Sequence, residues 1–234
     1  MITKNEDEII ARHKAVLASK TFKNIAVSNR LSEARVLDMG CGFGEYMQRF
    51  GKNSVGITTT PEEVTYGETH GLDIRIGNVE KLSEYLNPEV DQFDCFWANN
   101  LFEHLLSPHA FLVNLKKFAK DDSKIILGVP MVPVLPSLMR VKKFGGALAS
   151  PHINFFTKDT FKLTVEFAGW RVVDIRSYFF KNSFIDHTTT RFAPHLYITA
   201  QNNPGYRYPE KKLKEWENDP LYQDLIKIMH SSQK

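Results

Sequence analysis

A carboxylate followed by three alternate glycines is the feature of this sequence best suited to bind a reactive ligand. The segment reads Val36-Leu-Asp-Met-Gly-Cys-Gly-Phe-Gly44, with Asp38 placed ahead of the glycines. Glycine is needed where a tight turn takes positive φ, and where backbone must lie directly against a ligand. A helix is expected over residues 43–50, and the amides at its start would point toward the same ligand. The segment therefore predicts a turn that binds a nucleotide-like molecule.

The charges in this turn favour one kind of nucleotide-like ligand over another. A dinucleotide fingerprint has its third glycine three residues after the second, but Glu45 stands there. The Asp38 carboxylate would repel a pyrophosphate and attract a ligand that carries an ammonium and a sulfonium group but no phosphate. S-adenosylmethionine is such a ligand. The alternatives are a nicotinamide-dependent oxidoreductase on a similar sheet and a turn with a purely structural role.

Alternating strands and helices must position this turn. Short apolar runs rich in β-branched residues alternate with amphipathic stretches, which is the pattern of βαβ units. Strands are expected at residues 35–39, 54–58, 73–77, 93–98 and 124–129, followed by a pair at 170–179 and 195–200. Helices are expected at 5–29, after Ser107, and from Thr157 to Phe167. In such a sheet, ligands bind outside the carboxyl ends of the strands.

Composition excludes several classes of protein. The 234 residues are 42% hydrophobic and 24% charged, which is typical of a globular chain. The net charge of +3 is too small to indicate a nucleic-acid partner. No apolar run is long enough to span a bilayer as a helix, and the two cysteines cannot form a disulfide framework. We expect a reduced, cytoplasmic protein with no membrane span.

Three segments in the right order resemble class I S-adenosylmethionine-dependent methyltransferases. Asp38 to Gly44 is similar to the first motif of that family. Phe93 to Leu105 is similar to its fourth-strand motif, including the Glu-His pair of a branch that contains small-molecule, lipid-precursor and sugar methyltransferases. His152 to Thr157, with the later Ala-Gly-Trp, resembles a late segment of the same branch. The resemblance implies a doubly wound, mostly parallel seven-stranded sheet with an antiparallel edge pair, which is a Rossmann-like fold.

The resemblance also implies roles for individual residues around S-adenosylmethionine. Those expected to bind the cofactor are Asp38, Gly40, Cys41, Gly42 and Gly44 at the methionine end, Thr58 and Thr59 at the ribose, Asn78 and Val79 beside the adenine, and Ala98 and Asn99 near the methyl donor. Two positions depart from the family pattern. The family usually has an acid where Thr58 stands and an aspartate where Asn78 stands. A catalytically silent module that kept the fold is therefore a further alternative.

The resemblance divides the chain into three parts. We expect an N-terminal helical segment at 1–32, the methyltransferase domain at 33–201, and a C-terminal helical tail at 202–234. The tail is a candidate for self-association into a homo-oligomer. A long loop at 130–152, rich in Pro and Gly, is expected to form part of the acceptor pocket or its lid.

Two histidines are candidates for catalysis. His152 follows the long loop at the expected mouth of the site, where an acceptor hydroxyl would need its proton removed, and a neutral imidazole suits that role. His104 is the second candidate, and a structural role is the alternative for both. The histidines show no metal-ligand spacing and neither cysteine has a second one nearby, so no metal is expected. The predicted reaction is methyl transfer to a small-molecule acceptor, with a hydroxyl of a sugar, glycolipid or lipid precursor as the first choice.

Overall fold

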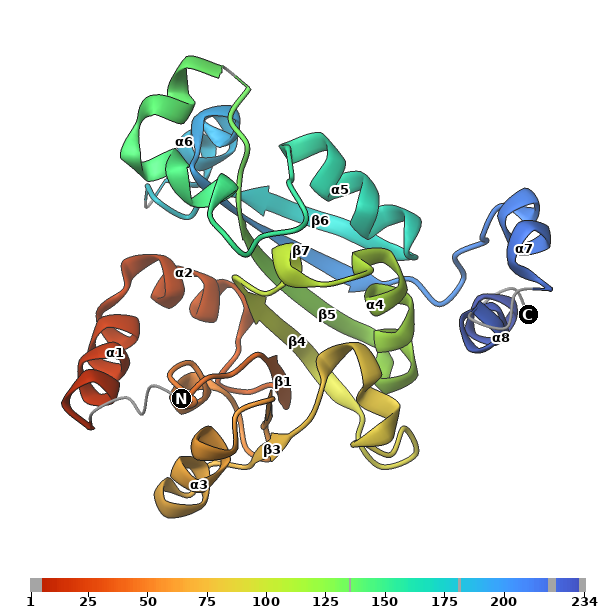
Figure 1. Ribbon diagram of the computed structural model, residues 1–234, viewed down its shortest axis with the longest axis horizontal. Helices are drawn as coiled ribbons and strands as arrows, with labels where there is room; N and C mark the ends of the chain where they lie inside the picture. The colour runs from red at the N-terminus through yellow and green to blue at the C-terminus, as the bar shows by residue number, and fades with distance from the viewer. Residues whose placement is uncertain (1–5, 135, 181, 219–221, 232–234) are drawn as a thin grey trace.

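A seven-stranded sheet runs through the molecule in the order β3-β2-β1-β4-β5-β7-β6 (Figure 1). The computed structural model describes residues 6–134, 136–180, 182–218 and 222–231. Strands β1 to β5 pair in parallel, whereas β7 runs antiparallel to both β5 and β6. The predicted fold is confirmed. The strands are β1 (Val36–Met39), β2 (Val55–Thr58), β3 (Ile74–Ile76), β4 (Phe93–Asn99), β5 (Ala119–Pro130), β6 (Trp170–Arg176) and β7 (His195–Asn202).

Helices cover both faces of the sheet (Figure 1). They are α1 (Glu6–Ala18), α2 (Lys20–Asn29), α3 (Pro61–His70), α4 (Pro108–Leu115), α5 (Lys158–Phe167), α6 (Ser183–Thr188), α7 (Glu210–Trp216) and α8 (Gln223–Ser231). Ser107 and Thr157 cap α4 and α5 as predicted, each accepting a hydrogen bond from a backbone amide of the first turn. Among the described residues, no helix has both the length and the apolar character needed to cross a membrane.

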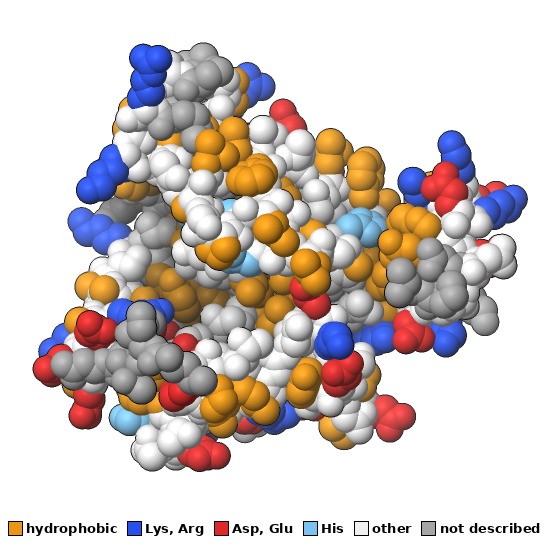
Figure 2. Space-filling view, in the orientation of Figure 1, with side chains coloured by type: hydrophobic (Ala, Val, Ile, Leu, Met, Phe, Trp, Pro, Cys, Tyr) orange, Lys and Arg blue, Asp and Glu red, His pale blue; other side chains and the backbone are white. Residues whose placement is uncertain are grey.

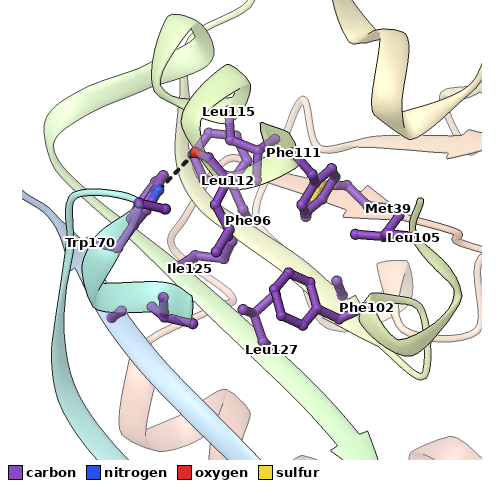
Figure 3. Packing of buried hydrophobic residues seen from close by; sticks show 14 of the residues in the cluster. Met39, Phe96, Phe102, Leu105, Phe111, Leu112, Leu115, Ile125, Leu127 and Trp170 are labelled. Atoms are coloured by element: carbon purple, nitrogen blue, oxygen red, sulfur yellow. Dashed lines mark hydrogen bonds between the residues drawn. The ribbon is translucent and has the colours of Figure 1, made fainter. Parts of the chain in front are cut away.

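The core lies on both sides of β4. Phe96 packs on the face covered by α4 and α5, where the Trp170 indole donates a 2.9 Å hydrogen bond to the Leu112 carbonyl (Figure 3). Its neighbour Trp97 points to the opposite face and meets Phe22 of α2, with ring centroids 5.4 Å apart. Because both faces are covered, β4 is apolar along nearly its whole length instead of alternating.

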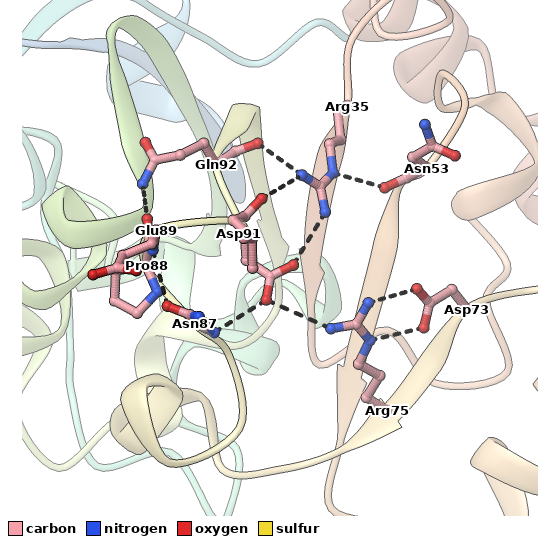
Figure 4. A network of polar contacts seen from close by, with 10 residues as sticks. Arg35, Asn53, Asp73, Arg75, Asn87, Pro88, Glu89, Asp91 and Gln92 are labelled. Carbon is pink, nitrogen blue, oxygen red and sulfur yellow. Dashed lines mark hydrogen bonds and ion pairs between the residues drawn. The ribbon is translucent and has the colours of Figure 1, made fainter.

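A polar network fixes the amino ends of the strands (Figure 4). The Arg35 guanidinium donates to the Asp91 carboxylate at 3.1 Å and to the Asn53 carbonyl at 3.0 Å. Arg75 forms two hydrogen bonds with Asp73, at 2.9 and 2.8 Å. Arg35 precedes β1, Asp91 precedes β4, and Asp73 and Arg75 lie at the start of the edge strand β3. Their contacts therefore connect the amino ends of these strands, at the end of the sheet opposite the glycine turn.

The helix expected over residues 43–50 is wrong. The structure has turns there and a single short 3-10 helix, Met47–Arg49. Gly44 takes a left-handed φ of 75°, which interrupts a helix at its start. Gly51 lies so close to the Ala34 backbone that a Cβ would stand 2.5 Å from its carbonyl oxygen. The chain therefore forms turns ahead of the short 3-10 helix.

The described parts of both terminal segments contain helices. The expected helix at 5–29 is two helices, because Ser19 caps α2 by accepting from the Phe22 amide. In the tail, Leu213, Leu225 and Met229 pack into the main core, so the tail buries these side chains on its own domain. Self-association through the tail stays a prediction. Residues 1–5, 219–221 and 232–234 of these segments lie outside the described part of the chain.

Candidate active site

The carboxyl ends of β1, β2 and β3 meet at a cavity of about 260 Å³. Six of the eleven residues predicted to bind the cofactor line it, namely Gly40, Gly42, Thr58, Thr59, Asn78 and Val79. The remaining wall is formed by Ile57, Glu63, Gly77 and Leu101. The cavity thus gathers residues that the sequence analysis assigned to the methionine, ribose and adenine ends of one ligand.

The glycines of the turn leave room that a side chain would fill. Gly40 and Gly42 have φ values of 71° and 58°, a left-handed region that favours glycine. A Cβ on Gly40 would stand 3.3 Å from the Leu101 side chain, and one on Gly42 only 2.8 Å from a Glu45 carboxylate oxygen. Both positions therefore favour glycine for conformation, and a side chain at Gly42 would also require Glu45 to shift.

Asp38 lies beneath this turn at the end of β1. Its side chain is buried, and its Oδ2 atom has no hydrogen-bond partner among the described residues. Burial raises its pKa well above the ordinary value, and the nearby Glu45 carboxylate raises it further. A cation placed at this oxygen would lower the pKa of Asp38 again, because it would favour the ionised carboxylate.

Four further residues that were predicted to bind the cofactor do not line the first cavity. Cys41 and Gly44 pack beneath the turn against Met47 and Ile74, and burial raises the pKa of the Cys41 thiol. Ala98 is buried at the end of β4. Asn99 Nδ2 donates a 2.9 Å hydrogen bond to the Tyr46 hydroxyl. These side chains support the turn and the end of β4, and their predicted cofactor contacts remain predictions.

The next helix brings a carboxylate to the end of β2, where the sequence has Thr58 in place of an acid. Thr58 Oγ1 donates a hydrogen bond to Glu63 Oε2, and it accepts a 3.1 Å bond from the Thr60 amide. Glu63 lies in the first turn of α3, which begins at Pro61. The sequence analysis missed Glu63. The sequence did contain a signal for Glu63. It is an acidic residue five positions after Thr58, where β2 ends without an acid of its own.

Asn78 has a local role at the adenine end of the cavity. Its Oδ1 atom accepts a 2.9 Å hydrogen bond from the Glu80 amide and so caps the following 3-10 helix. An adenine amino group beside Asn78 would donate its hydrogen bond to the same oxygen. An amide oxygen has two lone pairs, so the capping bond leaves one of them available.

The two candidate catalytic histidines contact each other, and one of them, His152, lines a second cavity of about 540 Å³. His152 and Glu103 line it, and the His104 and His152 rings pack edge to face with centroids 4.6 Å apart. His152 Nε2 is 3.9 Å from Glu103 Oε1. The amides of Ile153 and Asn154 both donate to the Glu103 carbonyl, which fastens the two distant segments together.

Glu103 is the unexpected member of this cluster. Its side chain is 1% exposed, and neither carboxylate oxygen has a hydrogen-bond partner on another described residue. Burial raises the pKa of Glu103, and burial together with His152 lowers the pKa of His104. The nearest ligand atoms of Glu103, His104 and His152 lie within 4.8 Å of one another. Sequence spacing could not show this cluster of metal-ligating residue types, because His152 joins the other two only through the fold.

A third, largely apolar cavity of about 560 Å³ adjoins the second and shares Lys143, Pro194 and His195 with it. Its aromatic lining includes Phe144, Phe179, Phe180, Phe192 and Tyr197. Figure 2 shows hydrophobic side chains gathered in and around the hollow of this face. Loop 130–152 supplies Lys143 and Phe144 to this cavity, and its role in an acceptor pocket stays a prediction.

His195 joins the two neighbouring cavities and was not among the predicted site residues. Its Nε2 atom is 2.9 Å from Asn100 Oδ1. Burial lowers its pKa to about 4, so the ring is neutral at physiological pH. The sequence predicts His195 at the start of a strand. A strand start gives no indication that the residue lies between two cavities.

Comparison with known proteins now decides the family. A family model described as a methyltransferase domain matches residues 10–175, more than half of the chain. The chain belongs to this family. The predicted methyltransferase family is thereby confirmed. The match begins inside α1, ahead of the domain boundary expected at residue 33.

A curated relative and two solved structures are similar to parts of this methyltransferase. A ubiquinone biosynthesis O-methyltransferase from Xanthomonas oryzae is 33% identical over 106 residues, which is 42% of this chain and 43% of the relative. The match therefore spans less than half the length of that relative. A SAM-dependent methyltransferase from Archaeoglobus fulgidus superposes with a TM-score of 0.57 at 18% identity, covering 85% of this chain and 100% of its own. The [4+2]-cyclase SpnF gives 0.55 at 15% identity, covering 78% and 80%.

Proposed function

We propose that this protein transfers the methyl group of S-adenosylmethionine to a hydroxyl of a small acceptor with an apolar chain, such as a lipid precursor or glycolipid. The observation that carries the proposal is the unpartnered Asp38 oxygen, two residues ahead of Gly40, which itself lines a cavity that a nucleoside could enter. A nicotinamide dinucleotide would bring a pyrophosphate toward Asp38 and Glu45, which disfavours the oxidoreductase alternative.

The residues around the first cavity fit S-adenosylmethionine. Asp38 would hold the ammonium group, and the backbone at Gly40 and Gly42 would lie against the methionine chain. Thr58 and Glu63 would hold the ribose hydroxyls, so the acid absent from β2 is replaced from α3. When bound, the cofactor supplies a methyl group activated by its positively charged sulfur.

The second cavity suits the reacting hydroxyl of the acceptor. His152 would accept the proton of that hydroxyl, and the buried Glu103 carboxylate, 3.9 Å away, would stabilise the imidazolium that forms. The adjoining apolar cavity would hold a hydrocarbon chain attached to the acceptor, since such pockets combine apolar walls with few polar groups. The name of the Xanthomonas relative, an O-methyltransferase, supports an oxygen acceptor.

Binding and transfer can be tested separately. Titration calorimetry should show saturable binding of S-adenosylmethionine and no binding of NADH. Transfer of a tritium-labelled methyl group should then be measured with phenol and 4-octylphenol, and with glucose and octyl glucoside. We expect the octyl member of at least one pair to be the better acceptor. NADH binding without S-adenosylmethionine binding would support the oxidoreductase. The fold also hosts a cyclase, so cofactor binding without transfer to any acceptor would support the silent module.

The catalytic role of His152 has its own test. His152→Gln should lower kcat by about 10²- to 10⁴-fold, because general-base catalysis contributes that much. The dissociation constant for S-adenosylmethionine should not change, since His152 lines a different cavity. His230→Gln on the exposed side of α8 is the matched control. A normal kcat in the His152 variant would leave that histidine a structural role only.

A further inference from the structure

Helix α1 lies next to the glycine turn and places the Arg12 guanidinium close to it. Arg12 Nη2 lies 2.7 Å from Glu45 Oε1 and 3.6 Å from the point where a Cβ on Gly42 would stand. The next residue, His13, is buried and has its Nδ1 atom 2.6 Å from Gln48 Nε2. Two consecutive residues of α1 therefore contact the turn region, and Arg12 is directed toward the glycine that a ligand must approach.

The amino-acid end of S-adenosylmethionine sets an electrostatic requirement that Asp38 alone does not meet. That end carries an ammonium group and a carboxylate on the same carbon. The turn offers two buried acids, Asp38 and Glu45, which attract the ammonium but repel the carboxylate. A cation is therefore needed close to the turn. In the described part of the chain, Arg12 is the cation that forms an ion pair with an acid of this turn.

The Arg12 side chain is suited to this contact. It is 45% exposed, whereas its partner Glu45 is 3% exposed, so part of the guanidinium remains accessible to a ligand. A guanidinium has five N–H donors in a planar fork that matches a carboxylate. One side of the fork can stay on Glu45 while the other binds a second carboxylate. Glu45 would then act as a positioning residue that holds Arg12 over the turn.

We propose that Arg12 binds the carboxylate of S-adenosylmethionine, which makes α1 part of the cofactor site. This inference rests on the proposed function, because it assumes that the cofactor occupies the cavity at the glycine turn. It assigns a binding role to a segment that the sequence analysis separated from the catalytic domain. It also gives a role to Glu45, the residue that stands where a dinucleotide fingerprint would have its third glycine.

Two ligands that differ only in the carboxylate test the inference. S-adenosylmethionine and its decarboxylated analogue share the ammonium, the sulfonium, the ribose and the adenine. Titration calorimetry on the wild-type protein should show tighter binding of S-adenosylmethionine. In Arg12→Gln, the affinity for S-adenosylmethionine should fall by about 10- to 100-fold, the usual effect of losing a hydrogen bond between charged groups. The affinity for the decarboxylated analogue should stay the same.

Matched variants keep the result interpretable. Lys14→Gln removes the same charge from an exposed position on the same helix and should bind both ligands normally. Arg12→Lys keeps the charge without the fork and should give an intermediate affinity. A thermal unfolding curve checks that each variant is folded. Equal wild-type affinity for the two ligands, or a parallel loss of both in Arg12→Gln, overturns the role of Arg12. Failure of the wild-type protein to bind either ligand overturns the proposed function instead.

Discussion

The amino and carboxyl ends of the parallel strands differ in how their charged side chains are paired. At the amino ends, Arg35, Arg75, Asp73 and Asp91 satisfy one another through hydrogen bonds and ion pairs (Figure 4). At the carboxyl ends, Asp38 is buried with an oxygen that has no hydrogen-bond partner in the described structure. Buried polar groups in native proteins are normally paired. The comparison indicates that one end is built to hold the sheet together and the other is built to receive a ligand.

This difference has an energetic consequence for the unliganded protein. A buried and unpaired carboxylate destabilises the folded state, because its lost hydration is not replaced. A ligand that brings a cation to the carboxylate regains that free energy on binding. Replacing an acid at the carboxyl ends should therefore weaken ligand binding without lowering stability, whereas the same replacement at the amino ends should lower stability without weakening binding.

The largest expected effect is that of Asp38→Asn. The affinity for S-adenosylmethionine should fall by at least about 10²-fold, since removing one partner of a buried charge pair costs about 3–5 kcal/mol. The melting temperature of the unliganded variant at pH 8 should equal or exceed that of the wild type, because the buried charge is gone. Calorimetry and thermal unfolding measure the two quantities. Wild-type affinity in a folded Asp38→Asn protein would contradict the comparison.

The matched change at the other end is Asp91→Asn. It removes the charge from an acid that accepts from the Arg35 guanidinium at 3.1 Å and from the Asn87 amide at 3.1 Å. The free energy of unfolding in urea should fall by about 1.5–3 kcal/mol, which is typical for hydrogen bonds to charged groups. The dissociation constant for S-adenosylmethionine should not change. Weaker cofactor binding at a temperature where the variant is fully folded would show that the two ends are coupled.

The pH dependence of cofactor binding is a further test of the role of Asp38. Burial and Glu45 raise the pKa of Asp38, so a proton competes with the ammonium group of the cofactor. The affinity for S-adenosylmethionine should rise with pH below this raised pKa, by at most about tenfold per pH unit, and level off above it.

The stability of the unliganded protein should show the opposite trend. A raised pKa means that the folded state binds the Asp38 proton more tightly than the unfolded state does. The contribution of Asp38 to stability is therefore fully present below the ordinary carboxyl pKa and is lost as the pH rises through the raised value. Neither trend should be present in Asp38→Asn. Calorimetric and unfolding measurements from pH 5 to 9 provide the check, and a slope that survives in this variant would assign it to another group.

The sequence predicted the lining of the first cavity better than the contacts around the second, for a physical reason. The glycine turn and the ends of β2 and β3 each lie within a few residues of a strand, so local patterns place them. Glu63 was missed because its contact with Thr58 depends on how α3 packs against β2. The contact between Glu103 and His152 depends on how loop 130–152 returns to β4, and no local pattern encodes that path.

The error at residues 43–50 has a related origin. The resemblance to nucleotide-binding turns suggested a helix directly after the glycines. The left-handed backbone at Gly44 and the close packing of Gly51 on Ala34 decide against it. A cofactor without phosphate does not need the amides of a helix start, and Asp38 and Arg12 offer side-chain charges at the same turn instead.

The smallest expected effect concerns the exposed part of the amino-end network. The Arg75 and Asp73 side chains are 37% and 46% exposed, although they form two good hydrogen bonds. Arg75→Gln should lower the free energy of unfolding by less than about 1 kcal/mol, because solvent screens exposed ion pairs. The difference from the wild type should shrink further in 1 M NaCl, where the screening length is about 3 Å. A loss as large as that of Asp91→Asn would mean that Arg75 acts mainly through its 3.7 Å contact with Asp91, and that the network stabilises the sheet as a single unit.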